Sequence, residues 1–112
     1  MVKVITFGQG KSGWSQEDYS KYWYEKHGPL FAATFPQVKR YVQNHALNLG
    51  KGQPAIAGVA EFWFDDMEAY RSFVKLYNSE VGKPVRDDED KFIDKSKLTF
   101  YICEERVIKS LI

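Results

Sequence analysis

The chain has 112 residues, a length typical of one domain, so we expect residues 1–112 to form a single folded unit. Hydrophobic residues make up 44% of the sequence and charged residues 28%, which argues against a disordered chain. Sixteen Lys and Arg against fifteen Asp and Glu leave a formal net charge of +1, so no nucleic-acid or anionic-membrane partner held by bulk charge is expected.

Several features of the sequence predict a cytoplasmic protein without a membrane partner. Residues 1–8 become polar too quickly for a secretory signal peptide, and no apolar run approaches the ~18 residues of a membrane-spanning helix. The single cysteine, Cys103, can form no internal disulfide and is expected to be a small buried hydrophobe. The eighteen aromatic rings predict a large core, a ring-lined pocket, or both.

The first half of the chain predicts a strand, a helix and a second strand. Residues 2–7 are a β-branched run typical of a strand, and residues 8–13 form a glycine-rich loop. Ser15 can cap a helix, and Gly28-Pro29 is expected to end it, because the residue before a proline disfavours helical angles. A short second helical piece over 30–35 and a strand over 38–46 follow. The apolar stripe of the first helix consists of Tyr19, Tyr22, Trp23, the stem of Lys26 and Leu30.

The second half predicts the remaining elements of a ferredoxin-like α+β fold. A loop over 48–54 leads to a strand over 56–64, and Asp65 can cap a helix over 66–79. The polar stretch 81–97 contains a short helix over 87–94, and residues 98–108 form the last strand. The order β-α-β-β-α-β is that of one four-stranded antiparallel sheet with both helices on one face.

The third strand carries apolar side chains on both faces. Ala60, Phe62 and Phe64 lie on one face, and Val59 and Trp63 lie on the other beside Glu61. A sheet covered on one side alternates apolar and polar residues, so the face away from the helices needs a cover. A second copy of the same sheet would supply it, which predicts a homodimer in the form of a dimeric α+β barrel.

The glycine-rich loop imitates two nucleotide-binding motifs and matches neither. Residues 8–13 fit the pattern G-x-G-x-x-G, but no acidic residue ends the next strand, and two helices cannot cover both faces of a doubly wound sheet. A phosphate-binding P-loop would need a glycine where Ile5 stands. We therefore interpret the segment as a strand-to-helix loop and expect no cofactor.

The two histidines differ in how much they indicate. His27 is expected at the C-terminal end of the first helix, where the partial negative charge favours a protonated imidazole that could act as a general acid or hydrogen-bond donor. The alternative is a cap bonded to the last helical carbonyls. His45 lies on the same strand face as Tyr41. Because neither H-x-x-x-H spacing nor a facial triad is present, no metal site is expected.

Acidic residues give one further candidate. Glu61 stands in an otherwise apolar strand, where a buried carboxylate needs a partner or a raised pKa. A raised pKa would suit a general acid or base; the alternative is an ion pair across a dimer interface, with Arg40 or Arg106. The run Asp87-Asp88-Glu89-Asp90 lacks the calcium-loop pattern and is expected to be a solvated face.

Three segments resemble the EthD family. Trp14 to Tyr19 with Trp23 and His27-Gly28-Pro29-Leu30 is similar to the W-x-x-x-H-x-P-L type sequence that ends the family's first helix. The segments 36–41 and 60–66 match its second strand and the passage from its third strand into its second helix. The resemblance implies a dimeric α+β barrel, in agreement with the two-faced third strand.

The resemblance also implies a class of chemistry. The founding member is encoded beside an ether-degrading monooxygenase system, and relatives look like cofactor-free isomerases of lactones or processing enzymes of polyketides. The related methylmuconolactone isomerases use a cysteine in the third strand, where this chain has Phe62. The matching histidine and tyrosine are His27 and Tyr41. Oxygenases with the same barrel work without metal or flavin on electron-rich aromatic substrates.

These observations predict cofactor-independent acid–base chemistry on a small hydrophobic carbonyl, lactone or aromatic compound. The alternatives are a non-catalytic small-molecule binding or accessory protein of a monooxygenase system, and a cofactor-free monooxygenase. The expected catalytic residues are His27, Tyr41 and Glu61. The expected substrate-binding residues are Trp23, His45, Phe62 and Phe64.

Overall fold

The β-branched start of the chain forms a central strand of the sheet. The computed structural model describes residues 1–47 and 57–112. In it, β1 (Val2–Gly8) pairs with β3 (Gly58–Phe64) on one side and with β4 (Thr99–Cys103) on the other. Strand β2 (Arg40–His45) pairs with β3. Every pairing is antiparallel, and the strand order is β2-β3-β1-β4.

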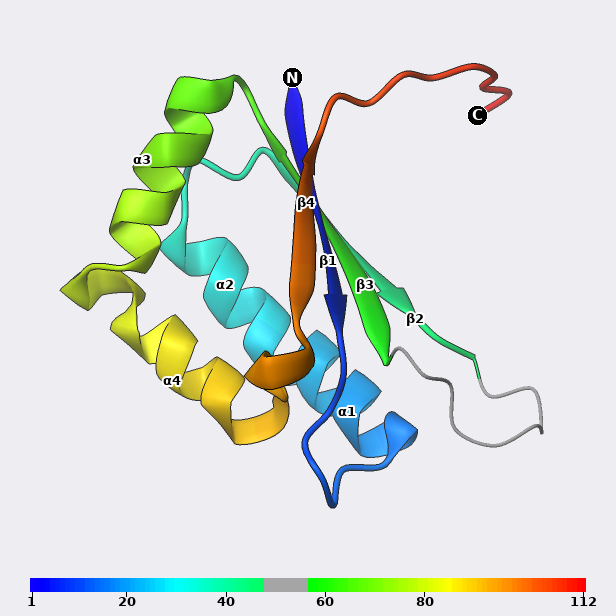
Figure 1. Cartoon of the computed structure of the whole chain (residues 1–112), viewed down its shortest axis with the longest axis vertical. Helices are drawn as coiled ribbons and strands as arrows, with labels where there is room; N and C mark the ends of the chain where they lie inside the picture. Colours follow the sequence, from blue (N-terminus) through cyan, green and yellow to red (C-terminus); the bar gives the residue numbers. More distant parts are fainter. Residues whose placement is uncertain (48–56) are drawn as a thin grey trace.

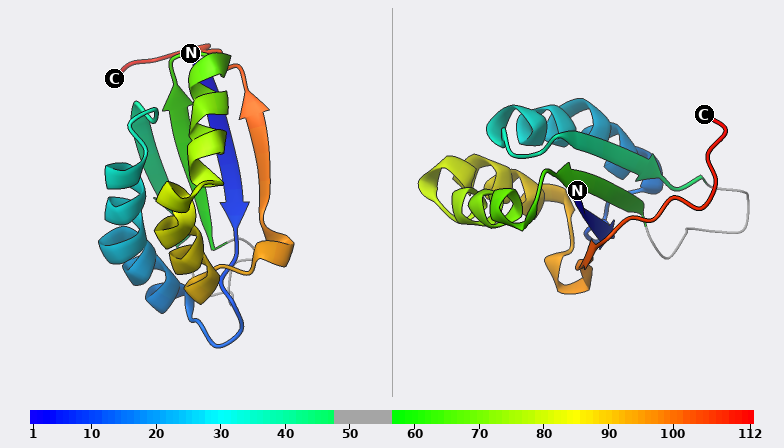
Figure 2. Two further views of the ribbon diagram at one scale, coloured as in Figure 1. Left: turned by 90° about the vertical axis from the view of Figure 1, so that its left-hand side faces the viewer. Right: turned by 90° about the horizontal axis from the view of Figure 1, so that it is seen from above.

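All the helices lie on one face of this sheet, as Figures 1 and 2 show. They are α1 (Gln16–Tyr22), a π-helical turn η1 (Trp23–His27), α2 (Gly28–Thr34), α3 (Met67–Tyr77) and α4 (Lys83–Phe92), with 3₁₀ turns η2 (Glu80–Gly82) and η3 (Lys95–Lys97). The predicted ferredoxin-like α+β fold is confirmed. None of the helices in the described ranges is long and apolar enough to cross a membrane.

Several predicted boundaries move. Asp66, not Asp65, caps α3, because Asp66 is extended and its carboxylate accepts the Ala69 N–H. Helix α4 begins four residues before the predicted start at 87, and the last strand ends at Cys103 instead of 108. The predicted loop over 48–54 lies outside the described residues.

The prediction that Gly28-Pro29 ends the first helix is wrong, because the helix continues through it. Gly28 has helical angles (φ −56°, ψ −53°), and its N–H bonds to the Trp23 carbonyl five residues back, which makes the turn π-helical. A glycine can be helical before a proline since it lacks the Cβ that would meet the proline ring. The wider turn also gives the Pro29 ring room where a regular helix would crowd it.

The π turn corrects a drift that the sequence spacing would otherwise create. The buried side chains of this helix and its C-cap residue recur every fourth position, and each is at most 4% exposed: Tyr19, Trp23, His27, Phe31 and, at the C-cap, Phe35. In a regular α-helix each step of four residues overshoots a full turn by about 40°, so four steps would rotate the stripe by about 160°. One under-wound turn reverses part of that rotation, and the whole stripe stays directed at the sheet.

The two faces of the sheet differ in chemistry. Val4, Ala60, Phe62 and Phe64 project toward the helices, as the register of β1 against β3 requires. The opposite face carries Lys3, Glu61 and Trp63 among apolar residues and has no helix over it (Figure 2). The helix-facing side thus supplies the apolar floor of a space between the sheet and the helices.

Replacing Gly28 with alanine tests why the helix can continue through Gly28-Pro29. A Cβ at position 28 would stand 2.7 Å from the Gln43 amide nitrogen and would meet the ring of Pro29. We expect Gly28→Ala to lower the free energy of unfolding by about 1–3 kcal/mol in urea denaturation. An ordinary helix interior gains up to about 1 kcal/mol from the same change.

The control for this prediction is the same change in a Pro29→Ala background. Without the proline ring, Gly28→Ala should cost less, because only the contacts with Gln43 and the Trp23 carbonyl oxygen remain. A chain stabilised by Gly28→Ala would contradict this explanation of the continuous helix.

Candidate active site

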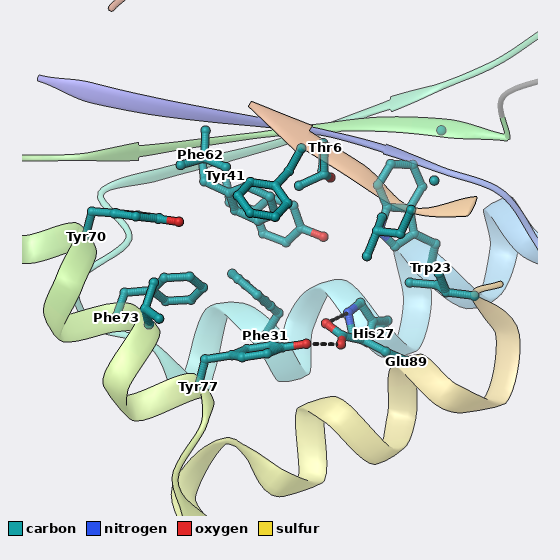
Figure 3. A pocket seen from close by; sticks show the side chains of 18 of the residues that line it. Thr6, Trp23, His27, Phe31, Tyr41, Phe62, Tyr70, Phe73, Tyr77 and Glu89 are labelled. Atoms are coloured by element: carbon teal, nitrogen blue, oxygen red, sulfur yellow. Dashed lines mark hydrogen bonds and ion pairs between the residues drawn. The ribbon is translucent and has the colours of Figure 1, made fainter. Parts of the chain in front are cut away.

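A cavity of about 360 Å³ lies between the helix-facing side of the sheet and the helices (Figure 3). Its floor is formed by β1 and β3, and its roof by η1, α2, α3 and α4. Two of its lining residues, Asn78 and Phe100, are exposed, so the cavity opens between the end of α3 and the edge strand β4. Its size falls in the lower part of the range of about 300–1,000 Å³ typical of small-molecule sites.

The walls are mostly aromatic. The ring of Tyr41 stacks on that of Phe62 with centroids 4.8 Å apart, and the ring of Phe31 lies 4.9 Å from that of Phe62. Trp23 closes one end and packs on Gly58, where any Cβ would overlap the indole ring. Three of the predicted substrate-binding residues, Trp23, Phe62 and Phe64, thus line this cavity.

The imidazole of His27 borders the cavity and is held from behind by Asp88. Its Nδ1 lies 2.8 Å from Asp88 Oδ2, and Asp88 Oδ1 accepts a hydrogen bond from the Tyr22 hydroxyl. An ionised carboxylate can only accept, so Nδ1 carries a proton and Nε2 is the nitrogen turned toward the cavity. This is the arrangement in which a buried carboxylate fixes the orientation and tautomer of a catalytic histidine.

A second carboxylate lies beside Nε2. Glu89 Oε2 is 3.7 Å from His27 Nε2, which is too far for a hydrogen bond, and Glu89 Oε1 accepts from the Tyr77 hydroxyl (Figure 3). Both His27 and Glu89 line the cavity and both are at most 8% exposed. The Nε2 atom is therefore available to a ligand, with a proton-accepting group next to it.

A hydrogen-bonded chain fixes the direction of the Tyr41 hydroxyl. Gln43 Nε2 lies 3.0 Å from the Trp23 carbonyl oxygen, which can only accept, so the amide nitrogen is correctly placed there. The same nitrogen donates to the Tyr41 oxygen at 2.9 Å, and Gln43 Oε1 lies 2.8 Å from His45 Nε2. His45 therefore donates to Gln43, and the Tyr41 hydroxyl keeps its own proton for another acceptor.

The environment keeps Tyr41 protonated at neutral pH. Burial raises the pKa of Tyr41 to about 12, although the hydrogen bond from Gln43 acts in the opposite direction. Because Tyr41 lines the cavity, its hydroxyl can donate a hydrogen bond to an oxygen of a ligand there.

The prediction that Asp87 to Asp90 form a solvated face is wrong for its two central residues. Asp88 and Glu89 are each 8% exposed, and they pair with Tyr22, His27 and Tyr77. Helical spacing from the fully buried Val85 and Phe92 would have placed both acids on the inner side of α4. The four consecutive acids therefore do not share one face of the helix, since Asp87 and Asp90 are exposed.

Glu61 lies on the other face of the sheet, away from His27 and Tyr41. Its carboxylate pairs with Lys3 Nζ at 2.7 Å and accepts a bond from Asn44 at 3.0 Å. These hydrogen bonds lower the pKa of Glu61, opposite to the raised value expected for a general acid or base, and its partner is Lys3 instead of Arg40 or Arg106. Glu61 therefore takes no part in the cavity.

The remaining candidates occupy different positions from those expected. The expected position of His27 at a helix C-terminus is wrong, because His27 lies in the middle of a continuous helix and caps no helix end. His45 does not line the cavity but packs on the Trp23 ring, with centroids 4.7 Å apart. Cys103 is half-buried at the end of β4. Across residues 1–47 and 57–112, no group of His, Cys, Asp and Glu is arranged to hold a metal ion.

Residues 11–96 match the model of the EthD domain. No curated protein sequence matches the chain. Among solved structures, an ethyl tert-butyl ether D (EthD) family protein from Bacillus halodurans is 22% identical with a TM-score of 0.70, over 95% of this chain and 99% of that one.

Two further solved structures are similar to this chain. A dimeric ferredoxin-like protein of unknown function from Thermobifida fusca is 13% identical (TM-score 0.65; 91% of this chain and 88% of that one). A hydroxynitrile lyase from Passiflora edulis is 17% identical (TM-score 0.62; 95% of both chains). At these identities the likeness extends to the fold alone.

Replacing Asp88 with asparagine tests the buried carboxylate behind His27. Burial alone would raise the pKa of Asp88, but hydrogen bonds from Tyr22 and His27 outweigh it, and the pKa lies below its usual value. Such a group stabilises the fold above its unfolded pKa, and that contribution is lost as the pH falls through the folded pKa. We expect Asp88→Asn to cost about 2 kcal/mol of unfolding free energy at pH 7, with the difference shrinking below about pH 4.

The matched control is Asp87→Asn, on the exposed side of the same helix, which should change the unfolding free energy by less than about 0.5 kcal/mol. Equal effects of the two substitutions in urea denaturation would contradict a structural role for the buried carboxylate.

Proposed function

The chain belongs to the EthD family, and from the geometry of its cavity we propose that it is a cofactor-independent enzyme. Its reaction is proton transfer on a small, largely hydrophobic carbonyl, lactone or aromatic compound. The observation that carries this proposal is the buried Asp88–His27 pair, which leaves His27 Nε2 facing an aromatic cavity. A simple binding pocket has no need of an oriented imidazole, whereas an acid–base enzyme requires one.

Each polar group of the cavity has a distinct role in this proposal. His27 Nε2 takes a proton from the carbon next to a carbonyl group, and Asp88 stabilises the imidazolium that forms. Tyr41 donates a hydrogen bond to the carbonyl oxygen, where negative charge develops as the C–H bond breaks. Glu89 stabilises the protonated Nε2 until the proton returns to the substrate at the same or another carbon.

The aromatic walls position the substrate. Trp23, Phe62 and Phe64, proposed as substrate-binding residues, present ring faces and edges to a flat ligand, and the exclusion of water strengthens the hydrogen bond from Tyr41. His45 does not contact the substrate in this proposal; it holds the Gln43 amide, which in turn orients the Tyr41 hydroxyl. The hydroxynitrile lyase with the same fold is consistent with carbonyl chemistry on this scaffold, as fold-level support.

Exchange of carbon-bound protons with solvent tests this function without knowledge of the natural substrate. In D₂O, we expect the protein to accelerate deuterium incorporation beside the carbonyl group of 2-tetralone, followed by proton NMR. His27→Asn should lower the catalysed rate by at least about 10²-fold, because it removes the base. Tyr41→Phe should lower the rate by about 10-fold or more, because it removes the donor to the carbonyl oxygen.

The control is Glu61→Gln, which changes a carboxylate on the opposite face of the sheet and should leave exchange unchanged. If isothermal titration calorimetry shows that 2-tetralone binds but exchange stays at the rate measured in buffer, catalysis would be contradicted and a small-molecule binding protein favoured.

We also propose that the chain is a homodimer formed through the uncovered face of the sheet. That face exposes or half-exposes Ile5, Val42, Val59 and Tyr101, and the segment 104–112 extends toward the same side (Figure 1). Apolar side chains on an uncovered sheet face favour association. The ferredoxin-like protein from Thermobifida fusca is described as dimeric, which supports a dimer at the level of the fold.

Sedimentation equilibrium at micromolar concentration should give twice the 13.0 kDa of the chain. Val59→Lys places a charge on the uncovered face and should shift the protein toward monomer, whereas Ala33→Lys, on the exposed side of α2, should not. A stable monomer in the unsubstituted protein would contradict the dimer.

A further inference from the structure

Among the residues that the structure describes, the cavity has no lysine or arginine in its lining, and its one basic group is the His27 imidazole, which is already paired with Asp88. Glu89 is the one carboxylic acid among the described lining residues. From this lining we propose that the site selects uncharged ligands and rejects carboxylates, phosphates and other organic anions. The inference rests on the proposed use of this cavity as the substrate site and names the class of substrate that it takes.

The lysines nearest to the carboxylates of Asp88 and Glu89 lie outside the cavity. Lys91 Nζ lies 3.7 Å from Asp88 Oδ1, and Lys95 Nζ lies 3.4 Å from Glu89 Oε1. The Lys91 side chain is 65% exposed and that of Lys95 is 37% exposed, so water screens both charges. The carboxylate of Glu89 is 10% exposed and acts on the cavity through a medium of lower polarity.

The rings strengthen the same selection. Aromatic faces carry partial negative charge, and Phe31, Tyr41 and Phe62 line the cavity close to one another. An anion placed among them would lose its hydration without gaining a lysine or arginine partner, and the one imidazole, His27, already has the carboxylates of Asp88 and Glu89 beside it. A neutral aromatic ligand instead stacks on these rings.

The available hydrogen-bond groups fit a neutral oxygen. The Tyr41 hydroxyl is directed to donate, while the Tyr77 hydroxyl is already committed to Glu89. A single donor satisfies the oxygen of a ketone or the carbonyl of a lactone. A carboxylate has two charged oxygens and about four acceptor sites, which one hydroxyl cannot satisfy.

Three probes of nearly the same shape separate the effect of ligand charge from that of ligand size. We expect 2-acetonaphthone, a neutral ketone, to bind at least about 10²-fold more tightly than 2-naphthoate at pH 7.5, as measured by isothermal titration calorimetry. The neutral amide 2-naphthamide should bind within about 10-fold of the ketone, because it shares the shape of the carboxylate without its charge.

Substitution of Glu89 locates the cause of the selection. Glu89→Gln should reduce the ratio of the dissociation constant of 2-naphthoate to that of 2-acetonaphthone by about 10-fold or more. The control Asp90→Asn alters an exposed acid on the same helix and should leave this ratio unchanged. The comparison of ketone, amide and carboxylate on the unsubstituted protein stands even if the Glu89 variant folds poorly.

The possible failures are distinguishable. If 2-naphthoate binds as tightly as the ketone, the charge selection is overturned, and proton exchange on 2-tetralone still reports separately on catalysis. If neither the ketone, the amide nor the carboxylate binds, the cavity is not the ligand site, and both the selection and the proposed function are overturned.

Discussion

The site depends on one geometric constraint, the spacing of four residues between the buried side chains of a single continuous helix. A stripe at that spacing would rotate away from the sheet in a regular α-helix, and the π-helical turn over Trp23–His27 keeps it in place. That turn requires a residue that tolerates helical angles before Pro29, which is Gly28. The position of the His27 imidazole over the cavity follows from these local requirements.

Helix α4 joins the stability of the fold to the chemistry of the site. Its Val85 and Phe92 are fully buried, and between them, on the same side, it supplies Asp88 and Glu89 to the histidine. Buried carboxylates are tolerated because tyrosine hydroxyls and the imidazole satisfy them, and removal of one partner would leave a desolvated charge. The groups that orient His27 are therefore also the groups that hold α4 against the first helix.

The fold was predictable from the sequence, and the site was predictable only in part. Alternation and turn residues predicted the order of strands and helices, because those signals are local. Trp23 and Phe62 were also expected to bind a substrate, and both line the cavity. The carboxylate partners of His27 were missed because Asp88 and His27 are 61 residues apart, and only the packing of α4 brings them together. Glu61 was wrongly expected to be catalytic for a related reason. The alternation of β3 gives the face on which Glu61 lies, but it does not give its partner Lys3, which comes from β1.

The central claim is that Asp88 holds the proton on His27 Nδ1 and leaves Nε2 to the ligand. The chain has two histidines, so ¹⁵N-histidine labelling with NMR gives two ring systems that His45→Asn assigns. The result predicted is a protonated Nδ1 for His27, a protonated Nε2 for His45, and a change in the His27 Nε2 resonance on saturation with 2-acetonaphthone. An unprotonated His27 Nδ1, or an Nε2 resonance that the bound ketone leaves unchanged, would contradict the claim.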